Sequence, residues 1–400
     1  MTSGPFAMRV ERLHDGHRWW PDRDVLVVVE GAHIAEVGPA RVLAEKYARL
    51  PLIHHEDAVL TPGWIDTHAH TTLPGDGTAI EEIAPLAFEE RVQIAARNLQ
   101  RHLRGGVTTV RDLGSHLDYL GWPPDPATMP RLIRYGMPIT AEQGHMHWFG
   151  GALGDGRASA DIARANLDAG AEGLKLVGTG GGTVGTVPHH TTLTVEELRA
   201  AIEIAHAQGR RATVHALTNE AVRRASQAGA DGVEHVGFLD VEGESALDPE
   251  ALEAAIAAGV VFGSTLGCNE AYLHLPAVSE TQDYREQRIR TDYYRDNARR
   301  LLASGARIAI GSDAGWKHTP FGEFRRELQL LASAGMPAEA ILTAATSGNA
   351  DALGAEGVTG QVRPGHPADL TVIDSADLAA RPPNVLAVVR GGIPVGHVGP

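Results

Sequence analysis

The chain has 400 residues, of which 43% are hydrophobic and 21% are charged, and its formal net charge is −15 at pH 7. The acidic excess argues against a groove for nucleic acid, and no apolar run approaches the ~18 residues of a membrane span. Its one cysteine, Cys268, excludes an internal disulfide. Because the N-terminal MTSGPFAMRV also lacks the order of a secretory signal, we expect a cytoplasmic protein that acts on a small molecule, without nucleic-acid or membrane partners.

Both ends of the chain are rich in short strand patterns. Residues 1–61 contain DVLVVVE and HIAEVG, and residues 360–400 contain DLTVID and LAVVRGGIPVG, with turn residues between them. Two β-rich ends around one central region predict a small composite β-sandwich that both termini build together.

The central region, residues 62–359, alternates between strand-like and helical patterns. The expected strands lie at 63–70, 107–113, 138–143, 173–178, 211–216, 232–237, 260–267 and 307–313. Thr194 with Glu197 forms a capping box, and Asp248 before Pro249 suits a helix start. The expected helix ends are marked by Gly170, Gly209, Gly229, Gly259, Gly305 and Gly335. Eight strand-then-helix units predict an α/β fold, a parallel (β/α)8 TIM barrel.

Metal-binding residue types recur where these strands end. They are His68, His70, Lys175, His215, His235 and Asp313. Barrel enzymes place their chemistry at the C-terminal ends of strands, and two histidines spaced by one residue project to the same side of a strand. Each residue alone is a weak signal, but their coincidence at the ends of five strands indicates a metal site.

Lys175 lies in GLKLVGTGGG, an apolar strand pattern that runs into a glycine-rich turn. A buried ammonium without a partner is very costly, so a lysine in a strand normally snorkels, pairs or changes its protonation state. From the residue alone, Lys175 is either an ordinary edge residue or part of the chemistry.

Motifs along nearly the whole chain resemble the metal-dependent amidohydrolase superfamily, and within it the prolidase-like and imidazolonepropionase-like branch. They are TPGWIDTHAH, GGVTTVRDLG, LKLVGTGGG, VHA, GVEHVG, IAIGSDAG followed by TPFGEF, and GQVRPGHPADLTVID. The resemblance implies a hydrolase that cleaves a C–N bond of a small molecule, and it leaves open whether the chain forms a homo-oligomer.

The same resemblance implies a binuclear metal centre. Lys175 would carry a CO2-derived carbamate that bridges two divalent cations. The implied ligands are His68, His70 and Asp313 at the more buried ion, and His215 and His235 at the more exposed one. Zinc is the expected ion for imidazole and carboxylate-type ligands, with manganese, cobalt and iron as alternatives.

The catalytic roles also follow from the resemblance. A hydroxide shared by both metals would attack the substrate carbonyl, while Asp313 acts as general base and then as general acid toward the leaving nitrogen. His145, in GHMHWFGG, would polarise the carbonyl or stabilise the oxyanion. A loop histidine held by hydrogen bonds is the alternative reading of His145.

Two departures from the resembled families narrow the substrate. Thr218 stands where related deaminases carry a glutamate, which favours cleavage of an amide, peptide-like, lactam or carbamate bond. Leu217 stands where related dipeptidases often carry a tyrosine, which favours a substrate of lower charge. Deamination of a cyclic amidine or aminated ring, ring closure in the reverse direction, and a non-catalytic barrel remain alternatives.

Loop residues supply further candidates for the substrate pocket. They are His147, Trp148, Leu217, Tyr272, Trp316 and His318. The charged stretch 279–300 predicts a helix, which is either a solvated surface or a mobile lid over the site.

Overall fold

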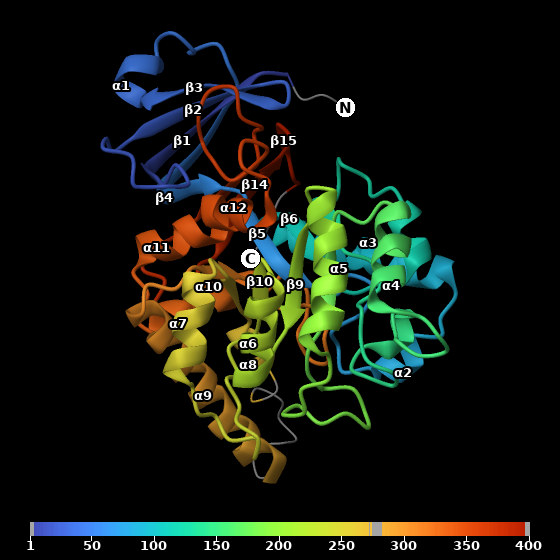
Figure 1. Cartoon of the computed structure of the whole chain (residues 1–400). Helices are drawn as coiled ribbons and strands as arrows, with labels where there is room; N and C mark the ends of the chain where they lie inside the picture. The colour runs from blue at the N-terminus through green and yellow to red at the C-terminus, as the bar shows by residue number, and fades with distance from the viewer. Residues whose placement is uncertain (1–3, 272, 274–281, 397–400) are drawn as a thin grey trace.

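Strands from both ends of the chain form one sheet beside a larger α/β region (Figure 1). The computed structural model describes residues 4–271, 273 and 282–396. The terminal sheet has seven strands in the order β15-β14-β13-β4-β1-β2-β3. Their bounds are β1 Phe6–Leu13, β2 Val25–Glu30, β3 His33–Pro39, β4 Leu52–Pro62, β13 Leu370–Ile373, β14 Val385–Arg390 and β15 Ile393–Pro394.

The strand β4 joins the two ends of the chain. It pairs with β1 in parallel and with β13 in antiparallel orientation, and after Gly63 the chain continues directly into β5, the first strand of the central region. Alternate residues of β1 and β2, such as Met8 and Val27, are buried in one apolar cluster, while Ala7 and Val28 are buried in another on the opposite face. The sandwich form of this unit and its expected boundaries at 61 and 360 stay predictions.

The central strands run parallel in two groups, β5-β6-β7 and β8-β9-β10-β11-β12. Their bounds are β5 Trp64–Ala69, β6 Val107–Asp112, β7 Arg131–Arg134, β8 Gly173–Val177, β9 Arg211–His215, β10 Gly232–Glu234, β11 Val261–Ser264 and β12 Ile308–Ile310. Isolated parallel bridges connect the groups, Ile139 with Leu176 at one edge and Ala69 with Ala314 at the other. Parallel strands connected by helices make this a TIM-barrel-like α/β fold.

The predicted position of the third strand is wrong. The strand lies at Arg131–Arg134, and within 138–143 the structure has isolated bridges but no strand. Gly136, with φ of +69°, turns the chain between the two segments. The side chain of Asn166 then accepts a hydrogen bond from the backbone N of Met137 at 2.9 Å and donates one to its carbonyl at 2.8 Å. These bonds use backbone groups that a continuous ladder would need.

Most helices lie outside the central strands, while α1 (Ala40–Leu43) lies beside β2 and β3 of the terminal sheet (Figure 1). The other helices are α2 Ile80–Ile83, α3 Phe88–Arg104, α4 Ser159–Asp168, α5 Val195–Ala207, α6 Asn219–Ala228, α7 Pro249–Ala257, α8 Leu266–Ala271, α9 Gln282–Ala303, α10 Phe324–Ser333, α11 Ala338–Thr343 and α12 Asn349–Leu353, with the short 3-10 helices η1 Leu117–Gly121 and η2 His147–Phe149 and the π-helical segment η4 Ala344–Gly348. In the described part of the chain, none of them has the length and apolar character needed to cross a membrane.

The predicted helix boundaries are confirmed in detail. Thr194 and Glu197 bond each other's backbone N–H groups as a capping box before α5. Asp248 accepts from the first turn of α7, which begins at Pro249. All six glycines expected to end helices have positive φ. The charged stretch that predicted a helix is α9, while its residues 279–281 lie outside the described residues.

His14, directly after β1, is fully buried between the terminal sheet and the helix ending at Thr343. Its ring packs edge-on against Trp19, with the centroids 5.3 Å apart. Burial lowers the pKa of His14 to about 4, although Asp15 partly opposes this. In the unfolded chain a histidine titrates near pH ~6.5. Between these values only the unfolded state binds the proton, so stability falls as the pH drops from about 6.5 toward 4.

Replacing His14 by Gln should therefore flatten the pH dependence of stability. Between pH 7 and 5, we expect the wild type to lose on the order of 1 to 2 kcal/mol more unfolding free energy than the variant. Denaturant titrations at several pH values measure this difference. His33→Gln, at an exposed position of β3, is the matched control and should keep the wild-type slope. Equal slopes for wild type and His14→Gln would contradict the prediction.

Candidate functional site

The predicted ligands meet in one cavity of about 590 Å³ at the C-terminal ends of the central strands. The residues that the structure brings together there are His68, His70, Lys175, His215, His235 and Asp313. They come from β5, β8 and β9 and from the turns after β5, β10 and β12, and all except His235 are buried. Asp313 and His235 have positive φ, 56° and 72°, an uncommon conformation that is concentrated at functional sites.

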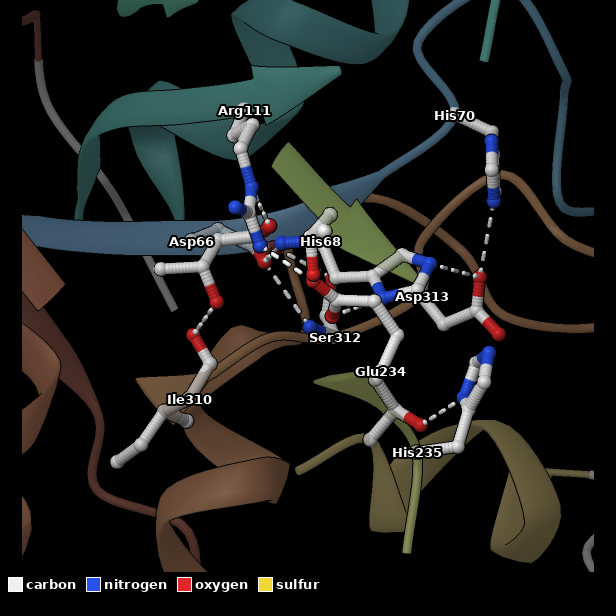
Figure 2. Close-up of polar contacts among 12 residues, drawn as sticks. Asp66, His68, His70, Arg111, Glu234, His235, Ile310, Ser312 and Asp313 are labelled. Carbon is white, nitrogen blue, oxygen red and sulfur yellow. Dashed lines mark hydrogen bonds and ion pairs between the residues drawn. The ribbon is translucent and has the colours of Figure 1, made fainter. Parts of the chain in front are cut away.

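Asp313 faces both histidines of the first central strand (Figure 2). Its Oδ1 lies 3.3 Å from His70 Nε2 and 3.6 Å from His68 Nε2, and it has no hydrogen-bond partner among the described residues. Two ligands about 2.0 Å from one tetrahedral ion lie about 3.3 Å apart. One ligand atom each from His68, His235 and Asp313 also lie within 4.8 Å of one another. These spacings suit a bound cation.

Lys175 is 1% exposed, and its Nζ has no hydrogen-bond partner in the described part of the chain. Burial lowers the pKa of Lys175 to about 8, although the carboxylates of Glu234 and Asp313 oppose the shift. About a tenth of the Lys175 side chains are therefore neutral amines at pH 7, and a neutral amine is the form that reacts with carbon dioxide. An orphaned amine among imidazoles fits a modified, metal-bridging lysine better than a structural ammonium.

The hydrogen bonds of two histidines fix which ring nitrogen is free. His68 Nδ1 lies 2.8 Å from a carboxylate oxygen of Glu234, which accepts, so Nδ1 carries the proton and Nε2 faces Asp313 with its lone pair. His215 Nε2 donates to the carbonyl of Gly180 at 3.0 Å, which leaves its Nδ1 unprotonated. Burial, reinforced by Lys175, lowers the pKa of His215 to about 3. Both rings are therefore in the neutral form that ligates metals.

Glu234 was missed by the sequence analysis although it supports His68. Its Oε1 accepts hydrogen bonds from Arg111 Nη2 and Thr213 Oγ1, both at 2.7 Å, while Oε2 holds His68 Nδ1 (Figure 2). Burial acts to raise the pKa of Glu234, but Arg111 and His68 outweigh it, so the pKa is lowered and the group is ionised. A carboxylate beside His235 in an apolar strand pattern was the available signal. Such partners orient metal-ligating histidines and raise their basicity.

Asp66 connects the two strands that carry the first and last ligands. Its Oδ1 accepts from the backbone N–H groups of His68 and Ser312, each at 3.0 Å. Its Oδ2 is 2.8 Å from His102 Nε2 and also accepts from the Ser312 hydroxyl. Because Ser312 directly precedes Asp313, one buried carboxylate sets the separation of His68 and Asp313.

His145 lies in the cavity wall and is buried. Its Nδ1 is 2.7 Å from the Thr183 hydroxyl, and its ring centroid is 4.7 Å from that of His215. Since Thr183 accepts from the backbone N of Met146, its own hydroxyl proton is available for His145 Nδ1. Burial, with the neighbouring His215, lowers the pKa of His145 well below its usual value, so this ring is neutral as well.

The remaining pocket candidates divide into three groups. Leu217, Trp316 and His318 line the cavity. Trp148 packs behind Trp316, with their centroids 6.2 Å apart, and neither it nor His147 belongs to the described lining. Tyr272 lies outside the described residues.

The donor set fits a divalent metal centre. It offers neutral imidazoles with lone pairs toward one cavity, a carboxylate oxygen without a hydrogen-bond donor, and a lysine amine without a partner. Imidazole and carboxylate-type ligands are those that zinc and neighbouring divalent metals take in hydrolases.

The chain belongs to the Amidohydrolase family, which it matches over residues 59–395, and it is a hydrolase. It is 24% identical to the ochratoxinase of Aspergillus niger, in an alignment that covers 93% of this chain and 83% of that protein. It is 29% identical to the imidazolonepropionase of Salinispora arenicola, with 93% and 92% covered. A crystal structure of a Xaa-Pro dipeptidase with bound methionine superposes with a TM-score of 0.78 at 23% identity, covering 98% and 100% of the two chains, which shows the shared fold.

Replacing Glu234 by Gln tests whether the Glu234 carboxylate orients His68 for metal binding. The change removes the charge that compensates buried Arg111, so we expect a loss of roughly 3 kcal/mol in unfolding free energy. Zinc affinity should fall about ten- to hundredfold, because His68 loses its carboxylate partner. Denaturant titration and calorimetric zinc titration measure the two effects. Glu242→Gln, at an exposed position after β10, should change neither, and wild-type zinc affinity in Glu234→Gln would refute the support of His68.

Proposed function

We propose that this protein hydrolyses a C–N bond of a small molecule, in an amide, peptide-like, lactam or carbamate group, with two divalent metal ions. The observation that carries the proposal is the buried Nζ of Lys175, which has no partner in the described chain although the four candidate histidine ligands and Asp313 line the same cavity. A one-metal site made of histidines and an aspartate does not require a buried lysine as a ligand.

In this proposal six side chains hold the ions. They are His68, His70, Lys175, His215, His235 and Asp313. The neutral amine of Lys175 adds to carbon dioxide and releases one proton, which gives a carbamate anion with two oxygen donors. When bound, the ions polarise the scissile carbonyl and lower the pKa of a water molecule toward neutrality. Zinc is the proposed metal, with manganese, cobalt or iron as alternatives.

Asp313 is the proposed general base and acid. Burial acts to raise the pKa of Asp313, but His68 and His70 outweigh it, so the pKa is lowered and the carboxylate is ionised at neutral pH. In this proposal the ionised carboxylate takes the proton of the attacking water and returns it to the leaving nitrogen.

His145 is the proposed donor to the oxyanion. If Thr183 donates to Nδ1 of the neutral ring, the proton of His145 is on Nε2. A hydrogen bond from that N–H stabilises negative charge as it develops on the carbonyl oxygen.

Three further features belong to the same proposal. We propose that the eight central strands close completely into a (β/α)8 barrel and that the terminal sheet folds as a small sandwich. The single cysteine supports a reducing, cytoplasmic location.

A substrate screen tests the reaction class. Enzyme loaded with zinc or manganese in the presence of bicarbonate should hydrolyse at least one of the following: N-acyl amino acids, dipeptides, lactams and carbamates. On that substrate Asp313→Asn should lower kcat about 10²- to 10⁴-fold, because the amide side chain cannot accept the proton. Asp168→Asn, at an exposed position, is the control. Near-native kcat in Asp313→Asn with full metal content would refute its role.

Lys175→Ala tests the bridging carbamate. We expect the variant to lose bound metal and activity, with partial recovery when formate, acetate or propionate supplies the missing carboxylate. Metal analysis by mass spectrometry measures the first effect. A carbamate carbon on the wild-type lysine is detected by ¹³C NMR after labelling with bicarbonate. Lys46→Ala, whose side chain is 58% exposed, should retain metal and activity. Full metal content in Lys175→Ala would exclude the bridge.

A further inference from the structure

The outer part of the metal-site cavity is positively charged. Lys317 and Arg290 line it, while Asp313 is the one carboxylate among its described lining residues. Asp313 lies deep in the site with His68 and His70. No described acid therefore neutralises the outer part of the cavity.

Lys317 lies over the glycine-rich turn that follows β8. A methyl group placed on Gly182 would be 3.1 Å from Lys317 Nζ, so the ammonium sits close to that turn. Its backbone is fixed at φ of 45°, and its carbonyl accepts a hydrogen bond from Gly77 N at 2.8 Å. Lys317 forms no ion pair with any acid in the described ranges.

Arg290 approaches from the helix α9. Tyr294, one turn further along, also lines the cavity, so this face of the helix is turned toward the site. Burial raises the pKa of Tyr294 to about 12, against the opposing charge of Arg290. Arg288, two residues earlier, is exposed and does not belong to the described lining.

We infer that Lys317 and Arg290 form a subsite that binds a carboxylate of the substrate. A guanidinium offers paired N–H donors that match a carboxylate, and an ammonium adds a second charge-assisted hydrogen bond. The inference rests on the proposed function and names its substrate class, a small anionic amide or carbamate. It replaces the expectation of a less charged substrate, which was based on Leu217. Leu217 offers no hydrogen-bond donor to a substrate carboxylate, whereas Lys317 and Arg290 both do.

Matched substrates test the subsite. An N-acyl amino acid and its C-terminal carboxamide share the scissile bond and differ in the carboxylate. With metal-loaded wild type, kcat/KM should be higher for the acid. Lys317→Met and Arg290→Met should each lower the acid-to-carboxamide ratio of kcat/KM roughly tenfold or more, through KM, since a charge-assisted bond is lost. Lys317→Arg should retain most of the ratio, and Arg288→Met should retain all of it.

The results distinguish a failure of the proposed subsite from a failure of the proposed hydrolysis. An unchanged ratio in Lys317→Met and Arg290→Met, or a wild type that does not prefer the acid, would overturn the inference. If the wild type hydrolyses neither compound or any other member of the screen, the proposed function fails, and calorimetry then decides the subsite. Tighter binding of the acid, lost in Lys317→Met, supports it, and equal binding of acid and carboxamide refutes it.

Discussion

The site depends on one buried carboxylate, Glu234, which is shared by groups from three strands. It accepts from Arg111 on β6, Thr213 on β9 and His68 on β5. Removing any charged member leaves another without compensation in a low-dielectric interior, at a cost larger than an exposed ion pair ever contributes. The arrangement fixes the tautomer and direction of His68, and Asp66 sets its separation from Asp313 in the same way.

The same network leaves Lys175 without a hydrogen bond. Glu234 is already bound by Arg111, Thr213 and His68, and Asp313 Oδ1 makes no hydrogen bond to the lysine amine. Burial lowers the pKa of Lys175 to about 8. Lys317 and Arg290 line the outer part of the cavity, while Asp313, the one carboxylate of the described lining, lies with His68 and His70. This distribution of charge supports the proposed metal ions inside the site and the proposed anion at its outer part.

The sequence correctly predicted helix starts and ends, because these features depend only on neighbouring residues. The capping box at Thr194 and the glycine that ends α6 at Gly229 need only neighbouring residues, and both were predicted. The third strand was misplaced because its position depends on Asn166, a residue of α4 that holds Met137 across the chain. Glu234 was missed because its three partners are distant in sequence.

The sequence by itself determined the α/β alternation, the family and the six candidate ligands, because strand periodicity, helix ends and ligand types are written in short segments. Only the tertiary structure decided which nitrogen of His68 is free and that Lys175 lacks a partner. It also decided that Lys317 and Arg290 border one cavity. Hydrogen-bond partners, burial and local charge depend on residues brought together from different strands, and no single segment contains that information.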